Sequence, residues 1–94
     1  MSNEKIVNGV DLEKIQGVIK AVSESPDLAK SKFRASNKWI NAGHNRTTIN
    51  GFYSAGQEIS HLQPFVLDAD EPPIIAGQDQ AANPVEHLLN ALVT

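Results

Sequence analysis

Asn83-Pro84-Val85-Glu86-His87-Leu88-Leu89-Asn90-Ala91-Leu92 is the stretch of sequence that decides the fold. Asn83 is a good helix N-cap, Pro84 suits the first helical position, and Glu86 follows the cap by three residues, which is the spacing of a capping box. The apolar positions after the cap have helical spacing and form one stripe, Val85, Leu88, Leu89 and Leu92. We therefore predict a helix over 83–94. No residue typical of a helix end follows, so we expect the complete protein to continue beyond Thr94.

The sequence upstream of this helix predicts strands. Phe33, Ala35 and Trp39 alternate with polar residues, as in a half-buried strand. A second strand is expected around the β-forming residues 47–53, and a third over 58–68, where Pro64 favours an edge position. These segments predict a three-stranded antiparallel sheet over 31–68, followed by a long loop over 69–82.

An earlier helix is expected over 11–25. Asp11 is a suitable N-cap, and the apolar residues after it have helical spacing: Leu12, Ile15, Val18, Ile19 and Val22. Residues 1–10 are expected to be a flexible lead-in. The expected fold class is thus α+β in one domain over 1–94: an N-terminal helix, a three-stranded antiparallel sheet, and then the start of a second helix across that sheet.

Composition narrows the functional classes. The chain has 94 residues, of which 40% are hydrophobic and 20% charged, with a net charge of −3. This is the composition of a globular protein, and the scattered Lys and Arg residues argue against a nucleic-acid partner. No apolar run approaches the ~18 residues of a membrane span, and the N-terminus does not have the pattern of a secretory signal, so we expect a cytoplasmic protein with no membrane partner.

The chain contains no cysteine, which excludes disulfides and thiolate nucleophiles within residues 1–94. His44, His61 and His87 are too scattered for a metal motif, and no Gly-rich phosphate loop is evident. We accordingly expect neither a metal ion nor a cofactor.

Three stretches of the chain resemble the OsmC/Ohr superfamily. The most specific is 83–92, and the second is 65–73 with Gly77-Gln78-Asp79 after it. The third runs from Phe33-Arg34-Ala35 and Trp39 through His44-Asn45-Arg46 to Gly51-Phe52-Tyr53. Together they cover most of residues 31–94.

The resemblance implies a thiol-dependent peroxidase that reduces organic hydroperoxides in oxidative stress. In the family, a cysteine follows about two turns after the start of the central helix, and an arginine held by the Glu of this helix lowers the thiol pKa. A second, distant cysteine closes a disulfide, which a dithiol reductant resets. Members are usually intertwined homodimers, so the resemblance also implies a homodimer here and about half of the family fold.

Carried over residue by residue, the resemblance assigns Glu86 as the supporting glutamate and Arg46 as the arginine, with Arg34 as second choice. The cysteine would be the first residue after Thr94, so the chain ends before its nucleophile and is expected to be inactive alone. A selenocysteine codon at that position would explain the end, as would an expression boundary or proteolysis. The alternative is a non-catalytic dimerisation or small-molecule-binding module. Glu86 would then only cap its helix, and Arg46 would be a solvated charge.

Overall fold

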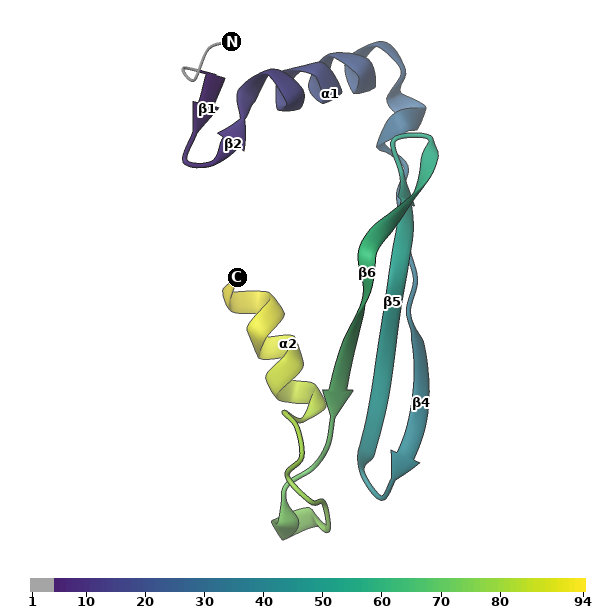
Figure 1. Cartoon of the computed structure of the whole chain (residues 1–94), viewed down its shortest axis with the longest axis vertical. Coiled ribbons are helices and arrows are strands. Elements are labelled where there is room, and N and C mark those ends of the chain that lie inside the picture. Colours follow the sequence, from purple (N-terminus) through teal and green to yellow (C-terminus); the bar gives the residue numbers. More distant parts are fainter. Residues whose placement is uncertain (1–4) are drawn as a thin grey trace. The chain divides into compact units, whose positions relative to one another are not determined.

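The computed structural model describes residues 5–94, which form two compact units (Figure 1). The first unit contains the residues up to Phe33 together with Phe52–Ile59, and the second contains Arg34–Gly51 with Ser60–Thr94. Two long strands, β5 (His44–Ser54) and β6 (Gln57–Ala69), contribute residues to both units. No helix of residues 5–94 is both long and apolar enough to cross a membrane.

The first unit begins with a short hairpin. β1 (Ile6–Val7) pairs antiparallel with β2 (Val10–Asp11), and Asn8 and Gly9 between them have φ angles of 52° and 78°. Positive φ at both central residues is the geometry of the tight hairpin turn that Asn-Gly favours. The residues expected as a flexible lead-in therefore include this hairpin, whereas residues 1–4 lie outside the described part.

Helix α1 (Leu12–Glu24) follows directly, and the Asp11 carboxylate accepts a hydrogen bond from the Lys14 backbone N–H at 3.2 Å. The prediction of Asp11 as N-cap is confirmed. The chain leaves α1 at Ser25-Pro26 through a 3-10 turn, η2 (Pro26–Ala29), and enters β3 (Lys32–Phe33).

The second unit contains β4 (Ser36–Asn41), most of β5 and β6, a 3-10 turn η3 (Pro73–Ile75) and helix α2 (Pro84–Val93). β4 pairs antiparallel with β5, with Asn37 opposite Thr47 and Lys38 opposite Arg46. β6 pairs with β5 as well, so β5 is the central strand of a four-stranded sheet. Side chains alternate between the faces of a strand. Asn45 and Thr47 therefore lie on one face of β5, and His44 and Arg46 on the other.

The expected fold class was wrong. The structure has two helices and two sheets, of two and four strands, rather than a helix followed by a three-stranded sheet and a helix. The extra sheet is the β1–β2 hairpin, which precedes α1. The fourth strand of the main sheet arises because Arg34 and Ala35 interrupt the first expected strand, so that β3 and β4 pair separately with β5.

The loop between β6 and α2 is closed at its base by Asp70, of which 1% is exposed. The Asp70 carboxylate accepts hydrogen bonds from the backbone N–H groups of Glu71 at 2.7 Å and Gln80 at 3.0 Å, and the Asp70 N–H donates to the Ala82 carbonyl at 3.2 Å. The bond from Gln80, with that from Glu71, holds the pKa of Asp70 below its ordinary value despite the opposing effect of burial. These hydrogen bonds of Asp70 hold the start of α2 next to the end of β6.

Helix α2 starts with the predicted capping box. The Asn83 side chain accepts from the Glu86 N–H at 2.8 Å, and the Glu86 carboxylate accepts from the Asn83 N–H at 2.9 Å. The apolar stripe of α2 is exposed: Val85 by 70%, Leu88 by 59%, Leu89 by 57% and Leu92 by 73%.

Candidate functional site

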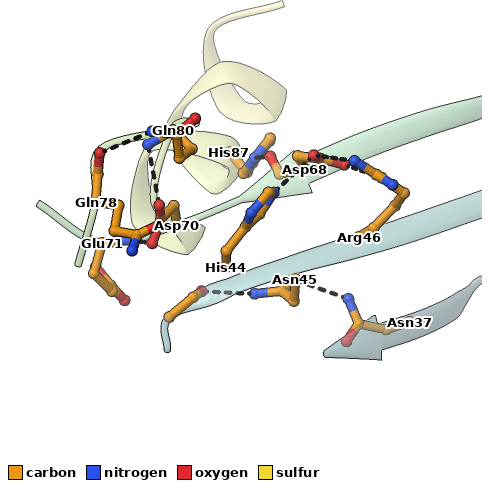
Figure 2. A network of polar contacts seen from close by, with 11 residues as sticks. Asn37, His44, Asn45, Arg46, Asp68, Asp70, Glu71, Gln78, Gln80 and His87 are labelled. Carbon is orange, nitrogen blue, oxygen red and sulfur yellow. Dashed lines mark hydrogen bonds and ion pairs between the residues drawn. The ribbon is translucent and has the colours of Figure 1, made fainter. Parts of the chain in front are cut away.

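An ionic cluster lies where β5 begins and β6 ends. The Arg46 guanidinium donates two hydrogen bonds to the Asp68 carboxylate, from Nε to Oδ1 at 2.7 Å and from Nη2 to Oδ2 at 2.9 Å (Figure 2). His44 Nε2 lies 2.8 Å from the same Oδ2 atom. The bidentate geometry fixes the plane of the guanidinium as well as its position. Local alternation places His44 and Arg46 on one face of β5, and Asp68 reaches them from β6.

The cluster keeps Asp68 ionised. The hydrogen bond from Arg46, followed by that from His44, holds the pKa of Asp68 well below its usual range and outweighs desolvation. The same pairing raises the pKa of Arg46. The three side chains are partly accessible, with exposed fractions of 17% for His44, 25% for Asp68 and 49% for Arg46. Arg46 is therefore a charged, oriented group that a ligand can reach.

Arg46 retains hydrogen-bonding capacity. A guanidinium has five N–H donors. Asp68 takes one from Nε and one from Nη2. Both N–H groups of Nη1 and the second of Nη2 are then available for a carboxylate, a peroxide oxygen or water. Within the part of the chain that the structure describes, the cluster can thus bind and orient an electron-rich group.

Glu86, the other expected site residue, lies elsewhere. Its carboxylate closes the capping box of α2, and no hydrogen bond or ion pair among residues 5–94 joins it to Arg46. Asp68 instead holds Arg46 within this chain. Arg34 is exposed and lies between β3, whose Phe33 is opposite Phe52, and β4, whose Ser36 is opposite Thr48.

A cleft of about 300 Å³ lies on the other face of β5 and β6. It is lined by Asn45, Thr47, Leu67, Ala69, Pro84 and His87. The lining positions on each strand are two residues apart, as expected for one face, while Pro84 and His87 come from the first turns of α2. His87 is attached to the sheet through Nε2, which lies 2.8 Å from the Asp68 backbone oxygen. The cleft is therefore formed between the end of β6 and the start of α2, within one unit.

Asn37 on β4 is hydrogen-bonded to two polar residues that line this cleft. Its Nδ2 group donates to Asn45 Oδ1 at 2.8 Å and to Thr47 Oγ1 at 2.9 Å, across the β4–β5 pair. Asn45 in turn donates to the Gly43 carbonyl at 3.2 Å. Both sides of the Asn45 amide are thus occupied, and its orientation is fixed.

Compared with family models and with curated proteins, the sequence matches none. The chemistry of this chain must therefore be argued from its own residues. Among the described residues there is no group of three or more His, Asp or Glu side chains arranged to hold a metal ion. Among the described residues, the Arg46–Asp68–His44 cluster and the cleft beside His87 are two features that could bind a ligand.

Sequence reasoning selected Arg46 but missed Asp68, His44 and His87. Only His44 and Arg46 have a local signal, because residues two apart on a strand share a face. The contact to Asp68 spans 22 residues and depends on the alignment of β5 with β6. That alignment is not readable from the local pattern of either strand.

Proposed function

We propose that this chain is the amino-terminal part of an OsmC-like, thiol- or selenol-dependent peroxidase that reduces organic hydroperoxides. Arg46 is its peroxide-site arginine, oriented by Asp68. The observation that carries the proposal is the bidentate Arg46–Asp68 pair, which fixes a guanidinium at a partly exposed position and leaves N–H donors unused. The resemblance of residues 83–92 to the start of the family's central helix supports it.

In the proposed reaction a thiolate attacks one oxygen of the hydroperoxide, and the O–O bond breaks. The sulfur becomes a sulfenic acid, and the other oxygen leaves as an alkoxide that takes up a proton to give the alcohol. A nearby guanidinium favours the thiolate over the thiol and stabilises charge on the departing oxygen. A second thiol then forms a disulfide with release of water, and a dithiol reductant restores both thiols. The nucleophile is not among residues 1–94, so the chain alone does not complete this reaction.

The proposal includes a second copy of the chain. A residue just after Thr94 would lie about 12 Å further along the α2 axis than His87. α2 lies over the face of β5 that carries Asn45 and Thr47, whereas Arg46 is on the opposite face. The proposal therefore takes the arginine of each site from the partner subunit. The exposed stripe of α2 is an apolar surface of the kind that drives association.

The test uses a longer protein with cysteine after Thr94, followed by the downstream residues of its gene. We expect it to consume cumene hydroperoxide with a dithiol donor, and Arg46→Gln, which removes the cation, to raise the thiol pKa and reduce the rate by at least about tenfold. Lys38→Gln is the matched control, because Lys38 lies opposite Arg46 in the sheet and has no role in the proposed site. If the longer protein does not consume peroxide, the proposal is wrong.

A non-catalytic ligand-binding module is the second candidate. It is favoured by the cleft beside His87, which is present without any nucleophile. The peroxidase proposal requires a cysteine or selenocysteine codon after the codon for Thr94. A cysteine or recoded selenocysteine codon supports the peroxidase, and any other sense codon rules out the selenocysteine hypothesis.

A further inference from the structure

The hydrogen bond of His87 determines which of its ring nitrogens carries a proton. Nε2 lies 2.8 Å from the Asp68 backbone oxygen. A carbonyl oxygen can only accept, so Nε2 must donate and therefore carries the hydrogen. In the neutral imidazole Nδ1 is then an acceptor. No hydrogen bond among the described residues uses Nδ1, because the only partner of this side chain is the Asp68 carbonyl.

Thr47 has the complementary property. Its Oγ1 atom accepts a hydrogen bond from Asn37 Nδ2 at 2.9 Å. A hydroxyl group has one O–H donor besides its acceptor lone pairs. Within residues 5–94 the Thr47 hydroxyl makes no other hydrogen bond, so its proton is free to be donated to a ligand.

Thr47 and His87 line the same cleft of about 300 Å³. The other lining residues are three apolar side chains and one amide, Leu67, Ala69, Pro84 and Asn45, and none is charged. Both sides of the Asn45 amide already have protein partners. Besides the second N–H of the Asn45 amide, the cleft therefore offers the Nδ1 acceptor of His87 and the O–H donor of Thr47 beside apolar walls.

We propose that this cleft binds neutral compounds that carry a hydroxyl or hydroperoxyl group on an apolar body. The O–H group of the ligand donates to His87 Nδ1, and its oxygen accepts from the Thr47 hydroxyl. The apolar body packs against Leu67, Ala69 and Pro84. A carboxylate is disfavoured, because an anion cannot donate to Nδ1 and no cationic side chain lines the cleft.

This inference deepens the proposed function, since organic hydroperoxides and the alcohols formed from them are both in the ligand class. It does not depend on the nucleophile, because binding is measured on residues 1–94. A longer protein that fails to reduce peroxide would remove the proposed function and leave this binding site intact. Absence of binding here would leave the Arg46 site untouched.

The experiment is a titration of the ¹⁵N-labelled chain with benzyl alcohol in mildly alkaline buffer, followed by NMR. We expect saturable shifts confined to the cleft residues and a pyridine-type ¹⁵N shift for His87 Nδ1 that moves on binding. Benzyl methyl ether has the same apolar body but cannot donate a hydrogen bond. It should bind about threefold to tenfold more weakly, the effect of one net hydrogen bond.

Thr47→Val is the principal variant, because it removes the hydroxyl donor while nearly keeping the volume. It should weaken benzyl alcohol binding by about threefold to tenfold. Thr48→Val is the matched control, because Thr48 is the next residue and lies on the opposite face of β5. This variant should bind benzyl alcohol as tightly as the unmodified chain does. The inference is overturned if Nδ1 of neutral His87 proves to be the protonated nitrogen, if the ether binds as well as the alcohol, or if no saturable shift occurs up to the solubility limit of the alcohol.

Discussion

Replacing Asn83 by Ala should loosen helix α2. The Asn83 side chain accepts from the Glu86 N–H, and the reciprocal bond from the Asn83 N–H to the Glu86 carboxylate relies on the same local geometry. Removal of an N-cap side chain costs about 1 kcal/mol, within a range of roughly 0.5–2 kcal/mol. α2 has 10 residues and none of them is buried, so packing within this chain compensates little for a lost cap. Helices of this length are marginal in water without such support.

Amide hydrogen exchange measures this effect residue by residue. A loss of about 1 kcal/mol corresponds to roughly fivefold faster exchange of the α2 amides. Asn90→Ala is the control in the same helix, because Asn90 lies in the interior where Ala has the higher helix propensity, and exchange should stay equal or slow down. Since His87 lies one turn after the cap, Asn83→Ala should also weaken benzyl alcohol binding. Equal exchange in Asn83→Ala and the unmodified chain would show that the capping box does not hold α2.

Three further outcomes are expected. The pKa of Asp68 is lower in the folded than in the unfolded chain. The ionised carboxylate therefore stabilises the fold above the ordinary carboxyl pKa of 3.8, and this stabilisation is lost as the pH falls below that value. Asp68→Asn should lower the urea midpoint at neutral pH and make the midpoint less sensitive to acid. Asp70→Asn should make the loop over 71–80 a preferred site of limited proteolysis, because one of the two amide donors would face an NH₂ group. The chain should be at least dimeric by light scattering at micromolar concentration, and Leu92→Lys should shift it towards a monomer; a monomeric mass for the unmodified chain would refute the proposed association.

Features fixed by a few neighbouring residues were predictable. Asp11 and Asn83 each cap a helix because their side chains reach backbone donors about one turn ahead. The turn between β5 and β6 is equally local, since its residues Ala55 and Gly56 have positive φ angles, of 52° and 76°. In each case the deciding interaction spans only a few residues.

The β1–β2 hairpin had a local signal that the prediction did not use. Asn8-Gly9 lies between the apolar residues Ile6-Val7 and Val10, and Asn-Gly next to apolar residues is the strongest short-range hairpin signal. The flanking strands have only two residues each, which is too short to show alternation. The interruption at Arg34 and Ala35 had no such signal, because alternation continues through both residues in the sequence.

The candidate site combines residues that are distant along the chain. Asp68 lies 22 residues from Arg46 and 24 from His44, and its carbonyl lies 19 residues from His87. These contacts follow from the pairing of β5 with β6 and from the point at which α2 leaves the loop. Neither the alignment of β5 with β6 nor the start of α2 relative to them can be read from a periodic pattern. Residue type alone could therefore suggest Arg46 but not its partner Asp68.

The hydrogen bonds of Asp70 hold the start of α2 next to the end of β6. The position of α2 therefore does not depend on the length of the loop between them. The bonds of Asp70 to Glu71, Gln80 and Ala82 lie at the base of the loop, whereas Ile74 at the tip is 89% exposed. The loop also has bonds of its own, because the Ile75 and Gly77 N–H groups both donate to the Pro72 carbonyl at 3.0 Å, and a Cβ at Gly77 would overlap the Glu71 carbonyl oxygen. An epitope tag or fluorophore-bearing peptide inserted after Ile74 would open η3 but leave the bonds of Asp70 in place, and should therefore not displace His87. The tip of this loop is thus the natural attachment point for a reporter on this protein.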